Sequence, residues 1–247
     1  MKLNDTPNNI KIVELKPDNI DLAKQMEALQ LTVNSQEKDK EEKHPGIGWP
    51  ILVEMSDPML GKSGIFLAAL KEKKLVGFYL LTIGRNSLTA LDLGVDPNFR
   101  GRGIANLLHD EAKKIARREG LQVKLSTVSP HNVASLKPNL NRDGFTVTGW
   151  AANKYGPGMH RFYVRGKFQS EKKPVPQRLL ERANRVPLER KAITTAVKQR
   201  RPFMVPLIEK HDAAGAEAYG HVNWDKYNGT HIHEENGQHY LLLERKR

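Results

Sequence analysis

The stretch VDPNFRGRGIANLL, residues 95–108, decides the fold. A strand-like run ends here, a turn with one Pro and two Gly follows, and an amphipathic helix pattern begins. Gly101 and Gly103 let the backbone approach a ligand without a Cβ in the way. The free amides of a first helical turn then converge on an anion, helped by the positive end of the helix dipole. Arg100 and Arg102 add positive charge, and so the turn suits a pyrophosphate.

Two other phosphate-binding motifs fit this chain less well. A dinucleotide fingerprint needs a third glycine where the chain has Asn106, and the preceding strand closes a series of hairpins instead of a first βαβ unit. A P-loop at Gly61-Lys62-Ser63 has Ser56 in place of its upstream glycine, and Pro58 stiffens the loop. Residues 100–105, RGRGIA, match the pattern Gln/Arg-x-x-Gly-x-Gly/Ala instead. The simpler alternative, an ordinary tight connection between a strand and a helix, stays open at this point.

Hydrophobic patterns on both sides of the turn indicate alternating strands and helices. Expected strands cover 10–15, 65–70, 75–83, 88–95, 121–128, 145–150 and 159–164, and expected helices cover 19–31, 101–119 and 132–142. The short links at 71–74 and 84–87 favour antiparallel hairpins. Pro138 is awkward inside the last of these helices because it has no N–H to donate.

These elements, in this order, resemble the GNAT superfamily of acyl-CoA N-acyltransferases over residues 10–168. LDLGVDPNFRGRGIANLL looks like the family's fourth strand and cofactor turn. LSTVSPHNVASLKPNLNRDGFTVTG looks like its fifth strand, the next helix and the Gly-Phe that opens its sixth strand. Two motifs in the correct order, about 30 residues apart, are more specific than either alone. The resemblance implies an α/β (α+β) fold: a mixed, mostly antiparallel central sheet with splayed fourth and fifth strands, flanked by helices.

The resemblance also implies acetyl-CoA as cosubstrate. It assigns cofactor binding to Leu93, Val95, Arg100, Gly101, Arg102, Gly103, Ile104, Ala105 and Asn132. The pantetheine arm would hydrogen-bond to the fourth strand around Leu93 and Val95 like an added strand. A backbone N–H near Val95 would polarise the thioester carbonyl as the amine attacks it directly. No covalent enzyme intermediate is needed, and the absence of cysteine from the chain agrees with that.

The attacking amine must be neutral and therefore needs a base, reached directly or through water. Asp92 lies on the fourth strand, near where the family often carries a carboxylate; the alternative is a capping or salt-bridged aspartate. His131, at the end of the fifth strand, has a suitable ordinary pKa; the alternative is a solvated loop histidine. Asp92 and His131 are the candidate catalytic residues.

One feature departs from the family pattern. Many members place a tyrosine in the helix after the fifth strand, as general acid for the leaving thiolate. Here the alignment reaches Pro138, Asn139 or Leu140, and none of these can donate such a proton. Three alternatives stay open: another group such as Tyr155 or Tyr163 substitutes, the thiolate leaves unaided, or activity is low or absent.

Composition bounds the remaining questions. The chain has 247 residues, a formal net charge of +12 and no cysteine. The lack of cysteine excludes disulfides, thiolate nucleophiles and cysteine-based zinc sites. No run approaches the length of a membrane span, and the polar start MKLND is unlike a signal peptide. We therefore expect a cytoplasmic protein without a membrane partner, whose basic surface attracts polyanions.

Residues 170–247 lie outside the resemblance, and we expect them to form a basic extension after a domain of residues 1–169. The pattern predicts two helices over 177–201, the second starting at Pro187, and then a hairpin of 230–233 and 239–242 around 234–237. The basic segment 172–201 either docks a polyanion such as tRNA or DNA or packs its apolar side on the domain.

Four histidines in this extension raise the question of a metal site: His221, His231, His233 and His239. Their spacing matches no known metal pattern and no cysteine assists them, so we expect no metal. The leading hypothesis is an acetyl-CoA-dependent N-acetyltransferase whose acceptor is an amine of a protein, a small molecule or an aminoacyl-tRNA. The alternative is a nucleic-acid or protein binding module on the same fold, with weak or no catalysis.

Overall fold

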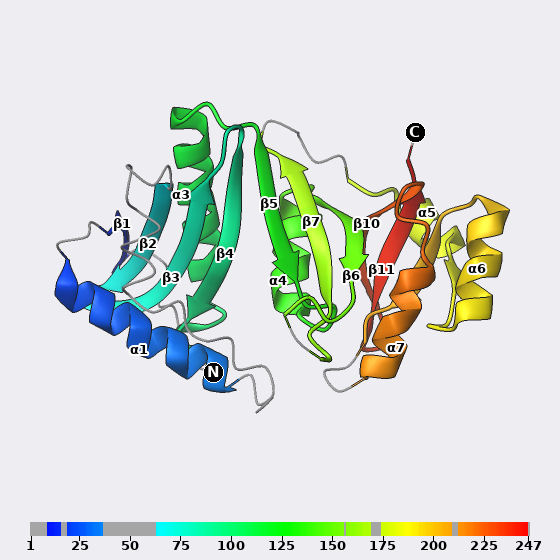
Figure 1. Ribbon diagram of the computed structural model, residues 1–247, viewed down its shortest axis with the longest axis horizontal. Coiled ribbons are helices and arrows are strands. Elements are labelled where there is room, and N and C mark those ends of the chain that lie inside the picture. Colours follow the sequence, from blue (N-terminus) through cyan, green and yellow to red (C-terminus); the bar gives the residue numbers. More distant parts are fainter. Residues whose placement is uncertain are drawn as a thin grey trace. The chain divides into compact units, whose positions relative to one another are not determined.

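The computed structural model describes residues 9–15, 19–36, 63–155, 157–168, 174–208 and 212–246. The chain forms two compact units, residues 1–124 and 125–247 (Figure 1). Parts of two sequence interpretations lie outside the described residues: most of the rejected P-loop, including Gly61 and Lys62, and residues 172–173 of the basic segment. The division into residues 1–169 and 170–247 stays a prediction.

The first unit contains a four-stranded antiparallel sheet and two helices. Its elements are β1 (Ile10–Glu14), α1 (Ile20–Gln36), β2 (Ser63–Lys71), β3 (Lys74–Ile83), β4 (Ser87–Val95) and α3 (Ile104–Arg118). Neighbouring strands pair in the order β1-β2-β3-β4, every pair antiparallel. The two hairpins expected from the short links are therefore confirmed.

The helices of the first unit cover opposite faces of its sheet (Figure 1). Phe78 belongs to the buried cluster that includes Met26 of α1. The next residue, Tyr79, faces α3, where its ring lies 5.1 Å from that of His109. Because successive strand side chains point to opposite faces, β3 separates the two helices. Strand β3 accordingly reads as a continuous apolar run, since both of its faces are buried.

A bulge re-aims β4 just before the candidate site. Leu80 pairs with Asp92, whereas Leu81 pairs with Ala90, so Leu91 is an extra residue in β4. Bulges of this kind increase the local twist and are frequent beside functional sites. Beyond the bulge, Gly94 must be glycine, because a Cβ there would lie 2.4 Å from the Phe78 ring.

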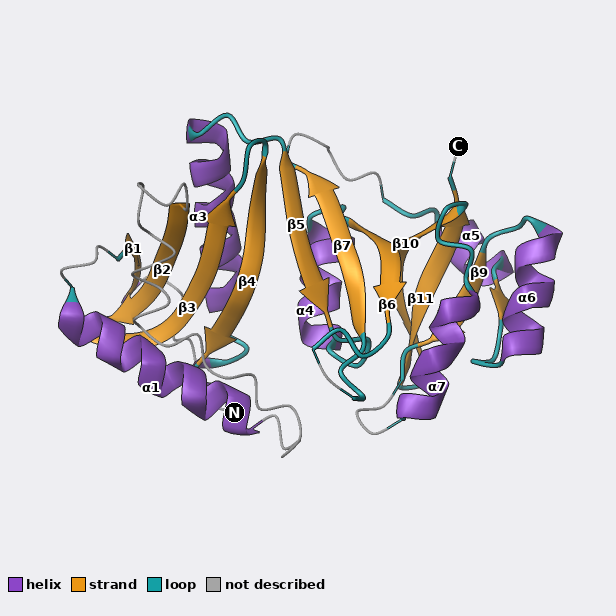
Figure 2. Cartoon of the chain, in the orientation of Figure 1, coloured by secondary structure: helices purple, strands orange, loops and turns teal. Residues whose placement is uncertain are grey.

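The second unit contains a longer sheet with short helices around it (Figure 2). Its elements are β5 (Val123–Val128, starting just before the unit boundary), α4 (Val133–Lys137), β6 (Thr146–Ala151), β7 (Arg161–Lys167), α5 (Gln177–Arg182), β8 (Asn184–Arg185), α6 (Arg190–Gln199), β9 (Phe203–Pro206), α7 (Ala213–Glu217), β10 (Tyr227–Glu235) and β11 (Gln238–Arg245). The strand order is β5-β7-β6-β10-β11-β9-β8. Four pairs are antiparallel: β7–β6, β6–β10, β10–β11 and β11–β9. The pair β9–β8 is parallel. The predicted mixed fold with a mostly antiparallel sheet is confirmed.

Two predictions about helices need correction. The expected helix 132–142 is α-helical only to Lys137 and continues as one π-helical turn, Pro138–Arg142. The wider turn accommodates the missing N–H of Pro138. The expected second helix of the extension begins at Arg190 and not at Pro187. The residue before a proline prefers an extended conformation, and Val186 instead donates its amide to Met204 O at 2.8 Å.

The predicted hairpin near the C-terminus exists but its turn is shorter than expected. Glu235 pairs with Gln238, so the turn contains only Asn236 and Gly237. Their φ angles of 49° and 78° are those of a type I′ turn, which Asn-Gly favours. Within the described ranges, no helix has the length and apolar character that crossing a membrane requires.

Candidate functional site

The turn between β4 and α3 is held in shape by contacts within the first unit. The Asp96 carboxylate accepts hydrogen bonds from the backbone amide and the side-chain amide of Asn98, at 2.9 and 3.1 Å. This caps the short 3₁₀ turn Pro97–Phe99. The backbone amide of Asp96 donates to Val76 O at 3.0 Å, which ties the turn to β3. The segment that leads into α3 is therefore held by the side chain and by the backbone of Asp96.

The two glycines of the turn border open space. Gly101 and Gly103 have φ angles of 75° and 77°, a conformation that L side chains rarely adopt. A Cβ at either position would meet no described atom within 4 Å. Their conformation favours glycine, and a ligand can approach the backbone beside them. The assignment of Gly101 and Gly103 to a pyrophosphate stays a prediction.

The N-terminus of α3 follows the glycines directly. Gly103 is the N-cap residue and has no side chain to cap the helix. The amides of Ile104, Ala105 and Asn106 occupy the first helical turn, where no intrahelical carbonyl is available to them. Together with the helix dipole they favour an anion at this point. Ile104 itself is buried against Gly77 of β3, which packs the start of the helix on the sheet.

Positive charge surrounds the turn, partly from residues that sequence reasoning missed. Arg100 Nε donates to Val95 O at 3.2 Å. The guanidinium of Arg102 lies 5.2 Å from the ring centroid of Phe99. Two further cations, Lys71 and Lys74 from the β2–β3 hairpin, lie 5.6 and 5.9 Å from the same centroid. A cation over an aromatic face is attracted by the negative face of the ring quadrupole. The register of the hairpin brings these lysines to the turn, and no local sequence pattern predicts their position there.

The backbone groups of Leu93 and Val95 in β4 point away from β3. They pair with Tyr79 and Gly77 of β3. The next residue, Asp96, donates its amide across this ladder to β3. Hydrogen-bonded and non-bonded pairs alternate in an antiparallel ladder, so Leu93 and Val95 direct their N–H and C=O groups away from β3. Arg100 reaches Val95 O from that side.

Asp92 lies on the α1 face of β4. It pairs with Leu80, whose side chain belongs to the cluster packed on α1. Oδ2 of Asp92 accepts a hydrogen bond from Nε2 of Gln30 at 2.6 Å. Gln30 is only 3% exposed, so the donor is fixed, and it fixes the direction of the carboxylate. Sequence reasoning missed Gln30, a single polar residue on the inner face of an amphipathic helix.

His131 and Asn132 lie in the second unit, in the turn after β5. Oδ1 of Asn132 accepts a hydrogen bond from the Ser135 amide at 3.0 Å and thereby caps α4. His131 is half-buried, and its carbonyl accepts from the Val133 amide at 2.9 Å. Asp92, the other candidate base, belongs to the first unit.

The two tyrosines named as substitutes for the missing general acid have different hydroxyl partners, although both rings lie beside Lys154. The hydroxyl of Tyr155 lies 3.1 Å from Thr127 Oγ1 on β5. The hydroxyl of Tyr163 accepts a hydrogen bond from Lys154 Nζ at 3.3 Å. The same ammonium lies 5.5 and 4.9 Å from the two ring centroids. Both tyrosines are well exposed, whereas Asn139 and Leu140, in the family's tyrosine position, are buried.

A buried polar pair that the sequence analysis did not single out lies beneath α3. Lys124 Nζ is 3.1 Å from His109 Nδ1, and both residues are buried. With the lysine as donor, the neutral imidazole carries its proton on Nε2. His109 shares the buried inner face of α3 with Leu108 and Ala112. A histidine on the apolar face of a helix is the sequence signal that could have identified it. In the part of the chain that the structure describes, no cluster of His, Asp or Glu side chains could hold a metal ion.

With this geometry in place, the comparisons with known proteins are informative. Residues 27–137 match the model of the acetyltransferase (GNAT) family. Residues 27–137, somewhat under half of the chain, are therefore similar to the GNAT acetyltransferase family. The match includes β2, β3, β4 and the glycine turn with α3, and it ends at the last residue of α4. No curated protein matches the chain by sequence.

Solved GNAT-type structures share the fold. The aminoglycoside 6'-acetyltransferase type Ii is 17% identical, with 65% of this chain and 99% of that chain covered and a TM-score of 0.51. The ribosomal-protein-S18-alanine N-acetyltransferase from Escherichia coli is 12% identical, with coverages of 68% and 99% and a TM-score of 0.51. The PaiA N-acetyltransferase from Thermoplasma acidophilum, solved in complex with coenzyme A, is 21% identical, with coverages of 64% and 98% and a TM-score of 0.50. At these identities the likeness concerns the fold of the GNAT domain.

Proposed function

We propose that this chain is an acetyl-CoA-dependent N-acetyltransferase and that it holds the pyrophosphate of acetyl-CoA at residues 100–105. The observation that carries the proposal is the pair Gly101 and Gly103, which have positive φ, border open space and lead directly into the uncapped start of α3. Backbone amides at a helix N-terminus, with Arg100 and Arg102 beside them, suit a compact anionic group. The family match and the coenzyme A complex of the Thermoplasma protein support the choice of ligand.

The other cofactor contacts follow from β4 and α4. Leu93 and Val95 offer backbone groups on the side away from β3, and we assign them to the pantetheine arm as an added strand. Bound acetyl-CoA supplies the acetyl group as a thioester. The Val95 amide is the donor that we assign to the thioester carbonyl oxygen. Asn132 is assigned to the cofactor through its side-chain NH₂ group, because its Oδ1 already caps α4.

Proton transfer is assigned to three side chains. Asp92, held by Gln30, and His131 are the two candidates for removing a proton from the acceptor amine. Tyr155 is our candidate for donating a proton to the departing thiolate, because its hydroxyl lies beside Thr127 on β5, the strand that opens the second family motif. The acceptor is an amine of a protein, a small molecule or an aminoacyl-tRNA. The names of the GNAT neighbours support this amine class, since they act on an aminoglycoside and on a protein alanine.

Calorimetry with acetyl-CoA tests the cofactor site. A Gly103→Val variant places a branched side chain where the backbone must approach the pyrophosphate, and we expect it to lose at least about tenfold in affinity. Gly120→Val is the matched control. Gly120, at the other end of α3, also has a positive φ, of 65°, and open space around its Cβ. It therefore carries the same strain without contacting the ligand.

Equal affinity of the two variants for acetyl-CoA would show that the pyrophosphate binds elsewhere. Thermal melting curves of both variants establish that any loss is one of binding and not of folding. Release of free thiol from acetyl-CoA in the presence of amines from the three acceptor classes then tests the transfer itself. No thiol release with any class, despite tight acetyl-CoA binding, would contradict the assigned activity and leave the binding site standing.

A further inference from the structure

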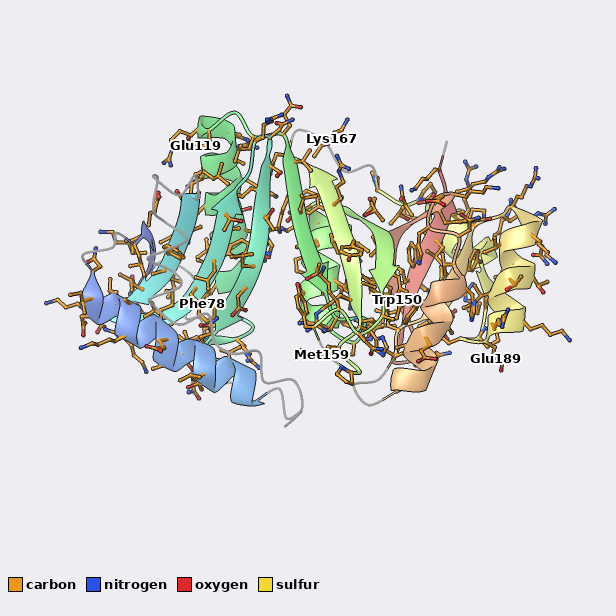
Figure 3. All side chains as sticks on the ribbon, viewed as in Figure 1. Phe78, Glu119, Trp150, Met159, Lys167 and Glu189 are labelled. Atoms are coloured by element: carbon orange, nitrogen blue, oxygen red, sulfur yellow. The ribbon has the colours of Figure 1, made fainter. Side chains whose placement is uncertain are left out.

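The outer face of α6 carries charge of a single sign. Ile193 and Ala196 are buried on its inner face. Its ten residues, RKAITTAVKQ, include no Asp or Glu. Five exposed cations form what we call the α6 cationic surface: Arg190, Lys191, Lys198, Arg200 and Arg201. Figure 3 shows nitrogen-tipped side chains pointing outward from this helix, with Glu189 at its start.

None of these five cations has a carboxylate within 4.0 Å among the residues described. The outer face of α3 provides an internal comparison. There Lys113 lies 3.8 Å from Asp110, and Lys114 lies 2.9 Å from Glu111. An ordinary solvent-exposed helix face mixes both signs in this way. The α6 cationic surface instead produces a local positive field, which is the arrangement that attracts a polyanion.

The end of α6 adds a second observation. Arg200 caps the helix with φ 58°, in the left-handed conformation that glycine or asparagine usually adopts there. A cation at a helix C-terminus is favoured by the dipole, which offsets part of the conformational cost. Arg201 lies one residue beyond the cap, outside the helix. The chain thus places two adjacent arginines where a single glycine would terminate the helix better.

A groove of about 510 Å³ runs beside α6, and its lining is mixed: apolar residues such as Val186 and Ala192 alternate with polar ones, and Glu189 contributes a carboxylate. Asn184, Lys191 and Gln199 contribute hydrogen-bond donors to its walls. Thr195 also lines it, but its hydroxyl already donates to Lys191 O at 2.8 Å. The groove therefore offers a few donors next to the α6 cationic surface, but Glu189 opposes an anion at its own end, so the groove is secondary to the exposed cations.

We propose that the α6 cationic surface binds the phosphate backbone of a nucleic-acid duplex. Arg190 and Lys191 lie at the start of α6, and Lys198, Arg200 and Arg201 lie at its end. Seven residues of helix separate the two groups by about 10 Å, so they can meet separate phosphates of one backbone. Residues 174–201 contain no Phe, Tyr or Trp, and hence no platform on which unpaired bases could stack, as single strands require. The apolar side of α6 is buried, so the helix has no face to insert into a membrane. Phosphate contacts of this kind are independent of base sequence.

Fluorescence anisotropy with a labelled short DNA duplex, on the full chain and over a range of salt concentrations, tests the proposal. The test variant combines Arg190→Gln, Lys191→Gln, Lys198→Gln and Arg201→Gln. Each lost phosphate contact reduces the slope of log K against log salt by about 0.9, so we expect the slope to fall by about 3 to 4. The matched control removes four cations from α3 instead, with Lys113→Gln, Lys114→Gln, Arg117→Gln and Arg118→Gln. We expect its slope to change by less than about 1.

Several outcomes would overturn the proposal. Equal loss of slope in both variants would mean that net charge alone attracts DNA. Tighter binding of a single strand, of poly-glutamate or of anionic vesicles at the same salt would assign the surface to that partner. Circular dichroism checks the fold of the test variant, and the milder pair Lys191→Gln with Lys198→Gln gives a second reading, with an expected fall of about 2 in the slope.

Discussion

Asp92 receives its direction from a side chain far away in the sequence. Gln30 is buried on α1 and donates to Oδ2 of Asp92 at 2.6 Å. A buried donor without its acceptor costs free energy, which explains why α1 and β4 keep this pair inside an otherwise apolar contact. The pair lies within the first unit. A base in such a position keeps a fixed geometry, which general base catalysis requires.

Replacement of the two candidate bases distinguishes their roles. If Asp92 is the base, Asp92→Asn keeps the shape and the hydrogen bond from Gln30 and lowers turnover by about 10²-fold or more, with acetyl-CoA affinity unchanged. His131→Ala tests the second candidate in the same assay. Asp110→Asn, on the outer face of α3, is the control for a general effect of charge. Equal rates for all three variants and the wild type would exclude both bases and indicate a water chain or an amine that arrives neutral.

At the scale of elements, two glutamates bind the β10–β11 hairpin to its neighbours. Glu234 Oε2 accepts hydrogen bonds from Lys137 at 2.7 Å and from His239 at 3.1 Å. Glu235 receives a bidentate pair from Arg185 of β8, with both distances 2.9 Å. The hydrogen bond from Lys137 lowers the pKa of Glu234, and that from Arg185 lowers the pKa of Glu235. The hairpin is thereby tied to α4 on one side and to β8 on the other.

These lowered pKa values predict how acid affects the hairpin. A carboxyl group with a lowered folded-state pKa stabilises the fold above its ordinary value, here 4.5, and loses that contribution as the pH falls through the lowered value. We therefore expect the urea midpoint of the wild type to fall more steeply below pH 4.5 than that of the double variant Glu234→Gln, Glu235→Gln. Glu217→Gln, on an exposed part of α7, is the control and keeps the wild-type steepness. Parallel curves for all three proteins would contradict the prediction.

Local patterns predicted some elements well, and the reason is physical. The strand, glycine turn and helix of residues 87–118 depend on neighbouring residues only, so their types follow from the sequence. The Asn-Gly turn of the hairpin is local for the same reason. Strand β8 was missed because Asn184 and Arg185 are extended only through pairing with Phe203 and Met204 of β9. Tertiary pairing outweighed the helical pattern of 177–201.

The residues of the candidate site also differ in whether local or non-local contacts place them. Gly101 and Gly103 could be predicted from the sequence, because their role depends on their own backbone conformation. Gln30 and the lysines around Phe99 could not be found in this way. Each of them reaches the site through the packing of α1 or through the register of the β2–β3 hairpin. Such positions are set by non-local contacts, which a single sequence does not reveal.

At the scale of the whole molecule, the last 70-odd residues share a core with the strands before them. Within the second unit, Gly229 of β10 pairs with Val147 of β6, and a Cβ on that glycine would lie 3.0 Å from Val147 Cβ. Asn141 donates to Ile232 O at 2.7 Å and accepts from the Ile232 amide at 2.8 Å. The Phe162 ring of β7 lies 4.9 Å from that of Tyr219, with Trp150, labelled in Figure 3, beside both.

A chain ending at residue 169 tests how deeply the extension is integrated. The truncation removes the partners of Val147 and Phe162, which are fully buried in the complete chain, and it leaves the two hydrogen-bonding groups of the Asn141 side chain without Ile232. Exposure of each large apolar side chain costs about 1.5–3 kcal/mol, and several together approach the total stability of a typical domain. We expect the truncated chain to aggregate or to melt well below the full chain, as measured by light scattering and calorimetry. The full-length α6 variant with four cations replaced is the control, because it alters the same extension without touching this core, and we expect it to melt like the wild type. A truncated chain that stays monomeric, melts like the full chain and acetylates its acceptor at full rate would show instead that residues 170–247 are an independent appendage.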